Sequence, residues 1–182
     1  RHGYTEVTDD DIKRTIGKTL EDLFHPHRRD RCRTTGRIQG RIPKRGRYAY
    51  DCQHGAFLET KSVLTALKDS GARIGIISTK YRFRIKELLD QHFLKIMDII
   101  VGGEDVKAAK PSPEGYSLPL SGYMRKAETL YIGDSTVDAE TAQAAGVDFA
   151  GVTHGVTTAK ELEKYPHRKI MNTLEELLAV QE

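Results

Sequence analysis

The chain has 182 residues, a net charge of +3 and a hydrophobic content of 38%, which fit one globular domain, or one domain with a small insertion. Its apolar runs are far shorter than a membrane span and we expect no signal peptide, so we exclude an integral membrane protein. Two cysteines without metal-type spacing argue against a disulfide scaffold and predict a reducing, cytoplasmic setting.

The first predicted element is an amphipathic helix over residues 8–24. Thr8 is a good N-cap, and the aspartates that follow it suit the positive end of the helix dipole. Apolar side chains then recur at helical spacing: Ile12, Ile16, Leu20, Leu23 and Phe24. Gly17-Lys18-Thr19 matches the end of a P-loop by letters, but no glycine stands at position 12 and a helix precedes it, so we reject a nucleoside-triphosphatase.

Residues 25–55 differ in composition from the rest of the chain. They hold nine of the 29 basic residues and two of the 26 acidic ones, and they have neither helix nor strand periodicity. We rank three explanations: a stretch translated out of frame comes first, a disordered basic loop second, and a nucleic-acid-binding segment third. A zinc site ranks below these, because the histidines and cysteines form no CxxC or HxxxH pair.

From about residue 59, helix-period segments alternate with short apolar runs. The runs predict strands over residues 72–78, 96–101, 130–132 and 149–152, with a further short run at 170–171. The segments around them predict helices near residues 63–67, 85–93, 136–145, 159–165 and 174–180. This alternation indicates an α/β fold with a doubly wound parallel sheet, in which ligands bind beyond the carboxyl ends of the strands.

The loop after the run 72–78 reads Ser78-Thr79-Lys80 and leads into a helix that starts near Tyr81. A hydroxyl beside the free N–H groups of a helix N-terminus is a ready site for a phosphate. An ordinary N-cap is the alternative, and the tripeptide taken alone favours that alternative.

The loop after the run 96–101 contains Lys110-Pro111-Ser112-Pro113. Prolines stiffen the backbone near Lys110, so its ammonium group can be aimed at a ligand. A solvated loop lysine is the alternative. Lys110 becomes a candidate site residue only because other strand-end loops also carry candidate site residues.

Two aspartates follow the strand at 130–132. Asp134 falls where the strand ends, and Asp138 lies one helical turn later on the same face. Two carboxylates so close together repel each other, so the pair predicts a hard divalent cation, Mg²⁺ with phosphate. The weaker alternative is that Asp134 caps the helix and Asp138 is a surface residue.

Three strings of the sequence, IISTK, KPSP and GDSTVD, stand in this order at successive strand ends. They resemble motifs two, three and four of the haloacid dehalogenase superfamily of phosphatases, and residues 1–24 and 59–182 are similar to its phosphoglycolate phosphatase-type members. The resemblance implies a Rossmann-like core over residues 58–182 and a small helical cap over residues 1–57, within which 25–57 is anomalous. It also implies Mg²⁺-dependent hydrolysis of a small phosphate monoester such as phosphoglycolate, through an aspartyl-phosphate intermediate.

The resemblance also implies roles for single residues. Ser78 would hydrogen-bond the substrate phosphate with help from the Thr79 amide, and Lys110 would stabilise the charge of the nucleophile and the phosphoryl group. In the cap, Lys18 would lie near the substrate. Asp134 would ligate Mg²⁺, and Asp138 would support the metal or Lys110.

The nucleophile of this family is an aspartate in a DxD motif after the first core strand, with the second aspartate as general acid and base. Asp9-x-Asp11 matches that motif by letters only, because it opens an amphipathic helix. Since Arg1 falls inside what resembles the start of the cap, we expect the first core strand to lie in about 25 residues upstream of it. We therefore predict that residues 1–182 alone are unstable and inactive.

Two alternatives to a phosphomonoesterase stay open. One is a catalytically inactive relative that binds phosphometabolites or partners. The other is a nucleic-acid-binding module that uses residues 25–55, for which binding must depend steeply on salt. For the leading hypothesis we expect a small phosphate ester as the ligand and no membrane partner, and neither the ester nor the oligomeric state follows from these residues.

Overall fold

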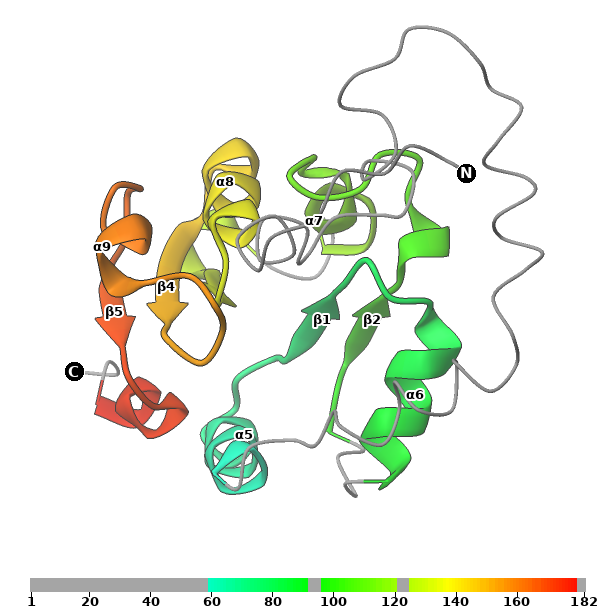
Figure 1. The fold of residues 1–182 in the computed structure, drawn as a ribbon. Helices are drawn as coiled ribbons and strands as arrows, with labels where there is room; N and C mark the ends of the chain where they lie inside the picture. Colours follow the sequence, from blue (N-terminus) through cyan, green and yellow to red (C-terminus); the bar gives the residue numbers. More distant parts are fainter. Residues whose placement is uncertain (1–58, 92–95, 121–124, 180–182) are drawn as a thin grey trace, which may run out of the picture. The chain divides into compact units, whose positions relative to one another are not determined.

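The computed structural model describes residues 59–91, 96–120 and 125–179 (Figure 1). All of them belong to one unit of the chain, Cys52–Glu182. The predicted helix over 8–24, the basic stretch 25–55 and Lys18 lie outside the described residues, so the expectations about the cap stay predictions.

The first sheet contains two parallel strands. Helix α5 (Thr60–Asp69) precedes strand β1 (Gly75–Ile77), and helix α6 (Arg82–Gln91) connects it to strand β2 (Ile99–Val101). Strand β1 pairs with β2 in register, with Gly75 opposite Ile99 and Ile77 opposite Val101. The backbone of Gly71 has φ +90°, a left-handed conformation that glycine adopts readily, and it follows the end of α5.

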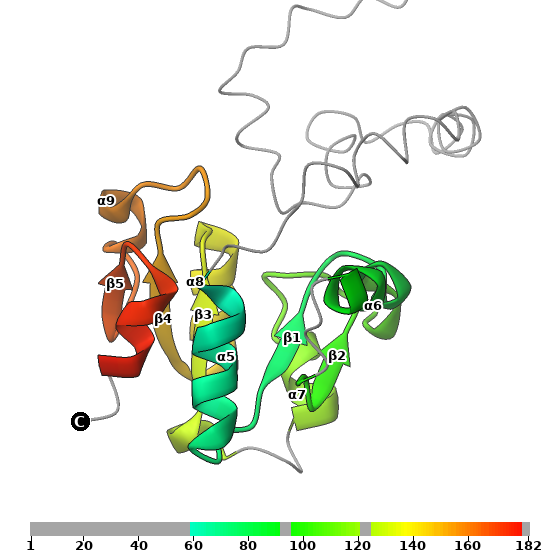
Figure 2. The same ribbon diagram turned by 90° about the horizontal axis from the view of Figure 1, so that it is seen from below.

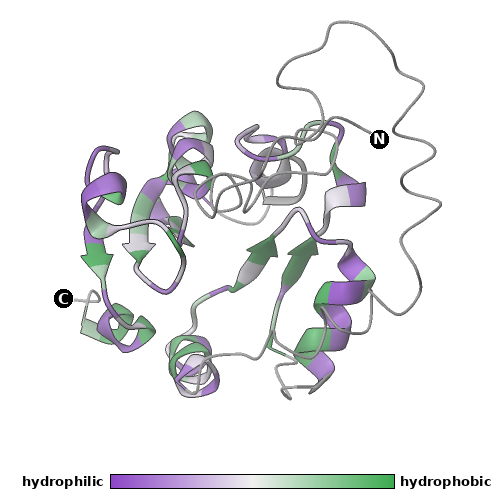
Figure 3. Cartoon of the chain, viewed as in Figure 1, coloured by the Kyte–Doolittle hydropathy of each residue, from purple (hydrophilic) through white to green (hydrophobic). Residues whose placement is uncertain are grey.

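The second sheet has three parallel strands in the order β3-β4-β5. Its elements are strand β3 (Leu130–Gly133), helix α8 (Thr136–Ala145), strand β4 (Asp148–Val152), helix α9 (Ala159–Leu162) and strand β5 (Lys169–Met171). Three 3₁₀ turns and one helix complete the described elements: η1 (Gly103–Asp105), α7 (Glu114–Leu120), η2 (Lys126–Glu128) and η3 (Leu174–Ala179). Figure 3 shows hydrophobic residues along β1 and β2 and a mixture of hydrophilic and hydrophobic residues along α6.

Helices cover both faces of the second sheet. On one face, Phe149 of β4 packs in a cluster with side chains of β3, α8 and α9: Tyr131, Ala139, Ala142 and Leu162. On the other face, the next residue, Ala150, packs with Val63 of α5, Met171 of β5 and Leu177 of η3. Figure 2 shows α5 beside η3. Because neighbouring residues of a strand point to opposite faces, this alternation confirms the α/β fold with parallel strands.

The two sheets meet through side chains. Ile77 of β1 packs against the Phe149 cluster and also against Tyr116 and Ala145. Within the described ranges no strand pairing joins β1 to β3, so each of these strands has one edge without a partner. Residues 72–78, predicted as a buried strand, form a strand only over 75–77, where Gly75 is exposed and the isoleucines are half-buried.

The C-terminal elements are shorter or tighter than predicted. Helix α9 ends at Leu162 rather than near residue 165. The last predicted helix is a 3₁₀ turn, η3. Helix α8 has the predicted bounds. In the parts of the chain that the structure describes, no helix is long and apolar enough to cross a membrane.

Candidate active site

Lys110 and Asp138 form a buried ion pair. The Lys110 Nζ lies 2.6 Å from Asp138 Oδ1, and the two side chains are only 15% and 9% exposed. Removing two charges from water costs several kcal/mol, so such a pair needs close geometry and further hydrogen bonds to persist. From the sequence we expected the ammonium group of Lys110 to have a fixed direction. In the structure it points to the carboxylate of Asp138, 28 residues further along the chain.

Asp138 has both carboxylate oxygens engaged. While Oδ1 accepts from Lys110, Oδ2 accepts a 2.5 Å hydrogen bond from the Ser135 hydroxyl. Ser135 is also the N-cap of α8, and its Oγ accepts from the Asp138 amide at 3.3 Å. Asp138 therefore holds Lys110 and the start of α8. Of the two aspartates in this segment, Asp134 is then the one whose carboxylate can contact a ligand.

Two glycines make room for the aspartates. A Cβ added to Gly133 would lie 2.3 Å from the Asp138 Cβ, and a Cβ added to Gly155 would lie 2.6 Å from Asp134 Oδ2. Real Cβ atoms do not approach other heavy atoms this closely, so a side chain at either position displaces an aspartate. Gly133 is part of the string that the sequence singled out, whereas Gly155 lies in the loop after β4 and was missed.

The Asp134 carboxyl is exposed at the end of β3. Desolvation raises its pKa, and the charge of Asp138 raises it further, while Lys110 and His154 partly oppose the shift. Positive charge placed beside Asp134 favours its ionised form. Lys110 thus places a positive charge where it favours the ionised form of Asp134.

These residues fit a divalent cation only in part. Within residues 59–91, 96–120 and 125–179, no three His, Cys, Asp or Glu side chains are grouped to hold a metal. Mg²⁺ is often held by one or two carboxylates together with substrate phosphate and water. Asp134, an exposed carboxylate whose charge is disfavoured by its surroundings, suits that role, and Asp138 suits the support of Lys110.

The loop that carries Lys110 is closed by Glu114. The Glu114 carboxylate accepts hydrogen bonds from the backbone amides of Lys107 (3.0 Å) and Ala108 (2.8 Å), which lower its pKa. At the other end of the loop, Ser112 Oγ accepts from the Glu114 amide at 3.3 Å. Glu114 was missed by the sequence analysis, although a serine two residues before a glutamate at a helix start is a recognisable signal.

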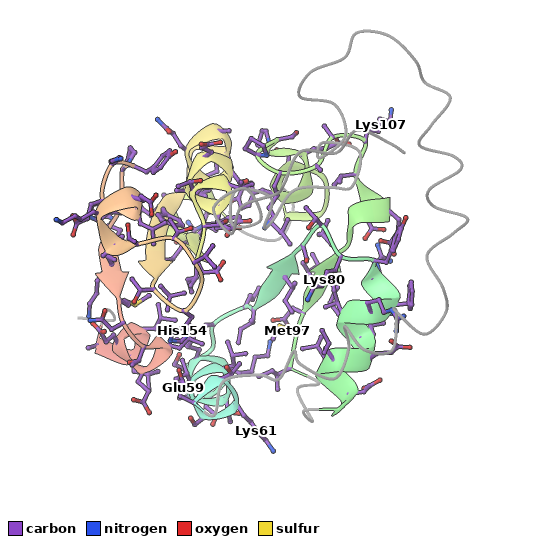
Figure 4. The ribbon with its side chains drawn as sticks, viewed as in Figure 1. Glu59, Lys61, Lys80, Met97, Lys107 and His154 are labelled. Atoms are coloured by element: carbon purple, nitrogen blue, oxygen red, sulfur yellow. The ribbon has the colours of Figure 1, made fainter. Side chains whose placement is uncertain are left out.

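Ser78 and Thr79 line a small cavity together with Lys110 and Gly103. The Ser78 Oγ accepts a hydrogen bond from the Lys80 amide (3.1 Å). Figure 4 shows Lys80 near the end of β1. Three of the predicted site residues are therefore neighbours, although they come from two different loops.

The N-terminus of α6 is bound by Glu104 rather than by Ser78. The Arg82 amide lies 2.8 and 3.0 Å from the two Glu104 carboxylate oxygens, and the Arg82 side chain pairs with Asp105. The Ser78 hydroxyl accepts from the Lys80 amide instead, so its predicted role toward a phosphate stays a prediction. Sequence reasoning missed Glu104 because it lies 22 residues from Arg82 and only the pairing of β1 with β2 brings them together.

His154, whose neighbour Gly155 lies against Asp134, contacts Glu59. The His154 Nε2 is 3.6 Å from Glu59 Oε1, and both side chains are largely buried. Figure 4 shows the two residues next to each other at the start of α5. His154 comes two residues after the end of β4, so the rule that ligands lie beyond strand ends would have found it.

A family model described as haloacid dehalogenase-like hydrolase matches residues 1–152 of the chain. Among curated proteins, a phosphoglycolate phosphatase from Cereibacter sphaeroides is 32% identical over 118 residues, which cover 64% of this chain and 53% of that protein. A phosphoglycolate phosphatase from Salmonella choleraesuis is 33% identical over 112 residues, covering 59% of this chain and 44% of that protein. The matches thus span about half the length of these relatives.

Solved structures agree with this likeness. A protein from Bacteroides fragilis described as a haloacid dehalogenase-like hydrolase is 48% identical, with a TM-score of 0.81 over 97% of this chain and 85% of that one. A Lactobacillus plantarum protein described as a phosphoglycolate phosphatase has a TM-score of 0.79 over 97% of this chain and 84% of that one. Its identity is 19%, so it bears on the fold alone.

Proposed function

The chain belongs to the haloacid dehalogenase-like hydrolase family, and on that premise we propose that it supplies the phosphate-binding core of a phosphatase for a small phosphate monoester. The observation that carries the proposal is Lys110, which pairs with Asp138, acts on the charge of Asp134 and lines a small cavity together with Ser78 and Thr79. Hydroxyl, ammonium and carboxylate groups are the parts needed to bind a phosphoryl group and neutralise its charge.

Lys110 stabilises the negative charge of the phosphoryl group in this proposal. Asp138 fixes the ammonium from one side, and the loop closed by Glu114 fixes the backbone that carries it. Ser78 and the Thr79 amide hydrogen-bond the phosphate from the loop after β1. Such groups accelerate a reaction because they are in place before the charge develops, so no reorganisation is needed during the reaction.

Asp134 is the residue that would hold Mg²⁺, together with oxygens of the phosphate and water. When bound, the cation adds positive charge next to the phosphate oxygens. Asp138, with both oxygens engaged, keeps Lys110 in place, which is the second of the two roles that the resemblance allows it.

The nucleophile is not among the described residues, which contain no DxD sequence. We propose that a DxD-bearing strand supplies it and pairs with the edges that β1 and β3 leave without a partner. The aspartate attacks phosphorus while the alcohol leaves, and water then hydrolyses the aspartyl phosphate to inorganic phosphate. Residues 1–57 are proposed as the cap over this site and 58–182 as the core.

Phosphoglycolate is the first substrate to test, because it is the phosphate ester in the names of curated relatives that are 32% and 33% identical. A cytoplasmic setting is proposed from the two cysteines alone. The inactive relative stays as the second candidate, since the described residues carry phosphate-binding groups without a nucleophile.

The test is release of inorganic phosphate by the natural protein that contains these 182 residues. A panel of small phosphate monoesters is assayed with Mg²⁺, with EDTA, and with the Asp134→Asn variant. We expect turnover of at least one ester that EDTA abolishes and that Asp134→Asn lowers by about 100-fold or more. If the protein binds phosphate but hydrolyses no ester, the result contradicts the phosphatase proposal and supports a catalytically inactive relative.

A further inference from the structure

The Tyr131 hydroxyl is buried without a partner. Of all the buried side-chain nitrogen and oxygen atoms in the described ranges, it is the one that makes no hydrogen bond. The side chain is 9% exposed and packs in the cluster with Phe149 and Leu162. Leaving a hydroxyl donor unpaired inside a protein costs about 1–3 kcal/mol, so a phenylalanine would serve this packing better.

Asp138 lies on the same side of β3 as Tyr131. Tyr131 and Gly133 are two residues apart on the strand and therefore point to the same face. The space where a Gly133 side chain would be is filled by the Asp138 side chain. Desolvation first, and then the charge of Asp138 and a side-chain interaction with Asp138, raise the pKa of the Tyr131 phenol. The two groups are therefore close, although their contact does not have the geometry of a hydrogen bond.

Asp138 has room for one more donor. Its carboxylate accepts one hydrogen bond from Lys110 and one from Ser135, whereas a carboxylate offers about four acceptor positions. If the ammonium group of Lys110 shifts toward a bound phosphate, its hydrogen bond to Asp138 lengthens. The Asp138 carboxylate then has room for another hydrogen-bond donor. Tyr131 carries the nearby hydroxyl that is not already engaged.

We propose that Tyr131 is a positioning residue whose hydroxyl donates to Asp138 when phosphate occupies the site, so that Asp138 keeps Lys110 in place. The inference rests on the proposed function for the identity of the ligand. In the phosphate-free protein the hydroxyl contributes no hydrogen bond, and in the phosphate complex it contributes one to a charged acceptor.

The test compares Tyr131→Phe with Tyr116→Phe in the natural protein. Tyr116 is a matched control, because it is 2% exposed and its hydroxyl donates to Thr129 Oγ1 at 3.2 Å. Three quantities are measured: the unfolding midpoint without ligand, the Kd of inorganic phosphate by calorimetry, and kcat and KM with the best ester. Phosphate binding is measured independently of turnover, so it tests Tyr131 even if the proposed hydrolysis fails.

We expect Tyr131→Phe to leave the midpoint unchanged or raised, to weaken phosphate binding by about tenfold, and to lower kcat by more than it raises KM. Tyr116→Phe should do the reverse, lowering the midpoint and leaving Kd and kcat unchanged. A Tyr131→Phe protein with wild-type Kd and kcat overturns the proposal. A lowered midpoint with wild-type Kd, or wild-type protein that binds no phosphate, overturns it as well.

Discussion

The side chain of Asp138 occupies the space that a side chain at position 133 would need, and Gly133 leaves that space free. We predict that Gly133→Ala forces Asp138 away from Lys110, lowering the free energy of unfolding by about 1–3 kcal/mol and weakening phosphate binding. Gly71→Ala is the control, since a Cβ there meets no atom within 4 Å and only the positive φ is strained. Denaturant unfolding and phosphate calorimetry on both variants measure the effect. Wild-type stability and affinity in Gly133→Ala would show that the contact is not needed.

Glu114 gives the Lys110 loop a dependence on pH. Its pKa is lowered in the folded protein, chiefly by the amides of Lys107 and Ala108, so the ionised form stabilises the fold above the ordinary carboxyl range. That contribution is lost as the pH falls through the lowered pKa. We therefore predict that Glu114→Gln lowers the unfolding midpoint at neutral pH and that the difference from wild type disappears in acid. A difference that is constant with pH would contradict this role for the charge.

The sequence proposed site residues in the loops after strands and missed the residues that contact them. Ser78, Lys110, Asp134 and Asp138 could be proposed because the positions of these loops can be read from hydrophobic periodicity. Glu104, by contrast, is recognised only by its contact with an amide 22 residues away. Such contacts depend on strand pairing and packing, which a periodicity in one segment does not encode.

Among the elements, α8 was predicted with the correct bounds because signals at both its ends agree. Ser135 caps its start, and Gly146, at φ +69°, follows its end. The length of β1 was overestimated, since an apolar run marks a strand but its pairing decides how much of the run becomes extended. Within the described residues β1 pairs on one side, with β2, and it keeps three residues of the predicted seven.

The edges of β1 and β3 lead to a prediction about hydrogen exchange. Among the strands that the structure describes, β4 is paired on both sides, while β1 and β3 are each paired on one. In the polypeptide of residues 1–182, we expect the backbone amides of β1 and β3 to exchange faster than those of β4, because amides without a partner are open to water. Equal protection of all three strands would show that both edges are covered within these residues.

For the whole molecule, the net charge of +3 combines two unlike parts. Residues 25–55 carry a local excess of seven positive charges, and the remaining residues are acidic overall. The described core is acidic in composition, yet Lys110 lines a small cavity together with Ser78 and Thr79. We therefore expect local geometry rather than total charge to govern what the core binds. The sequence could predict this core, and it predicts no regular structure for the basic stretch because no periodicity is present there.

Phosphate release by matched lysine variants tests the central claim most directly. Lys110 and Lys68 both pair with an aspartate, Lys110 inside the site and Lys68 with Asp98 at 2.5 Å on the surface. In the natural protein with Mg²⁺, we predict that Lys110→Met lowers kcat by about 100- to 1,000-fold, because it removes the charge aimed at the phosphoryl group. Lys68→Met should stay within about twofold of wild type, since an exposed ion pair contributes little. Turnover by Lys110→Met at the wild-type rate would contradict the account.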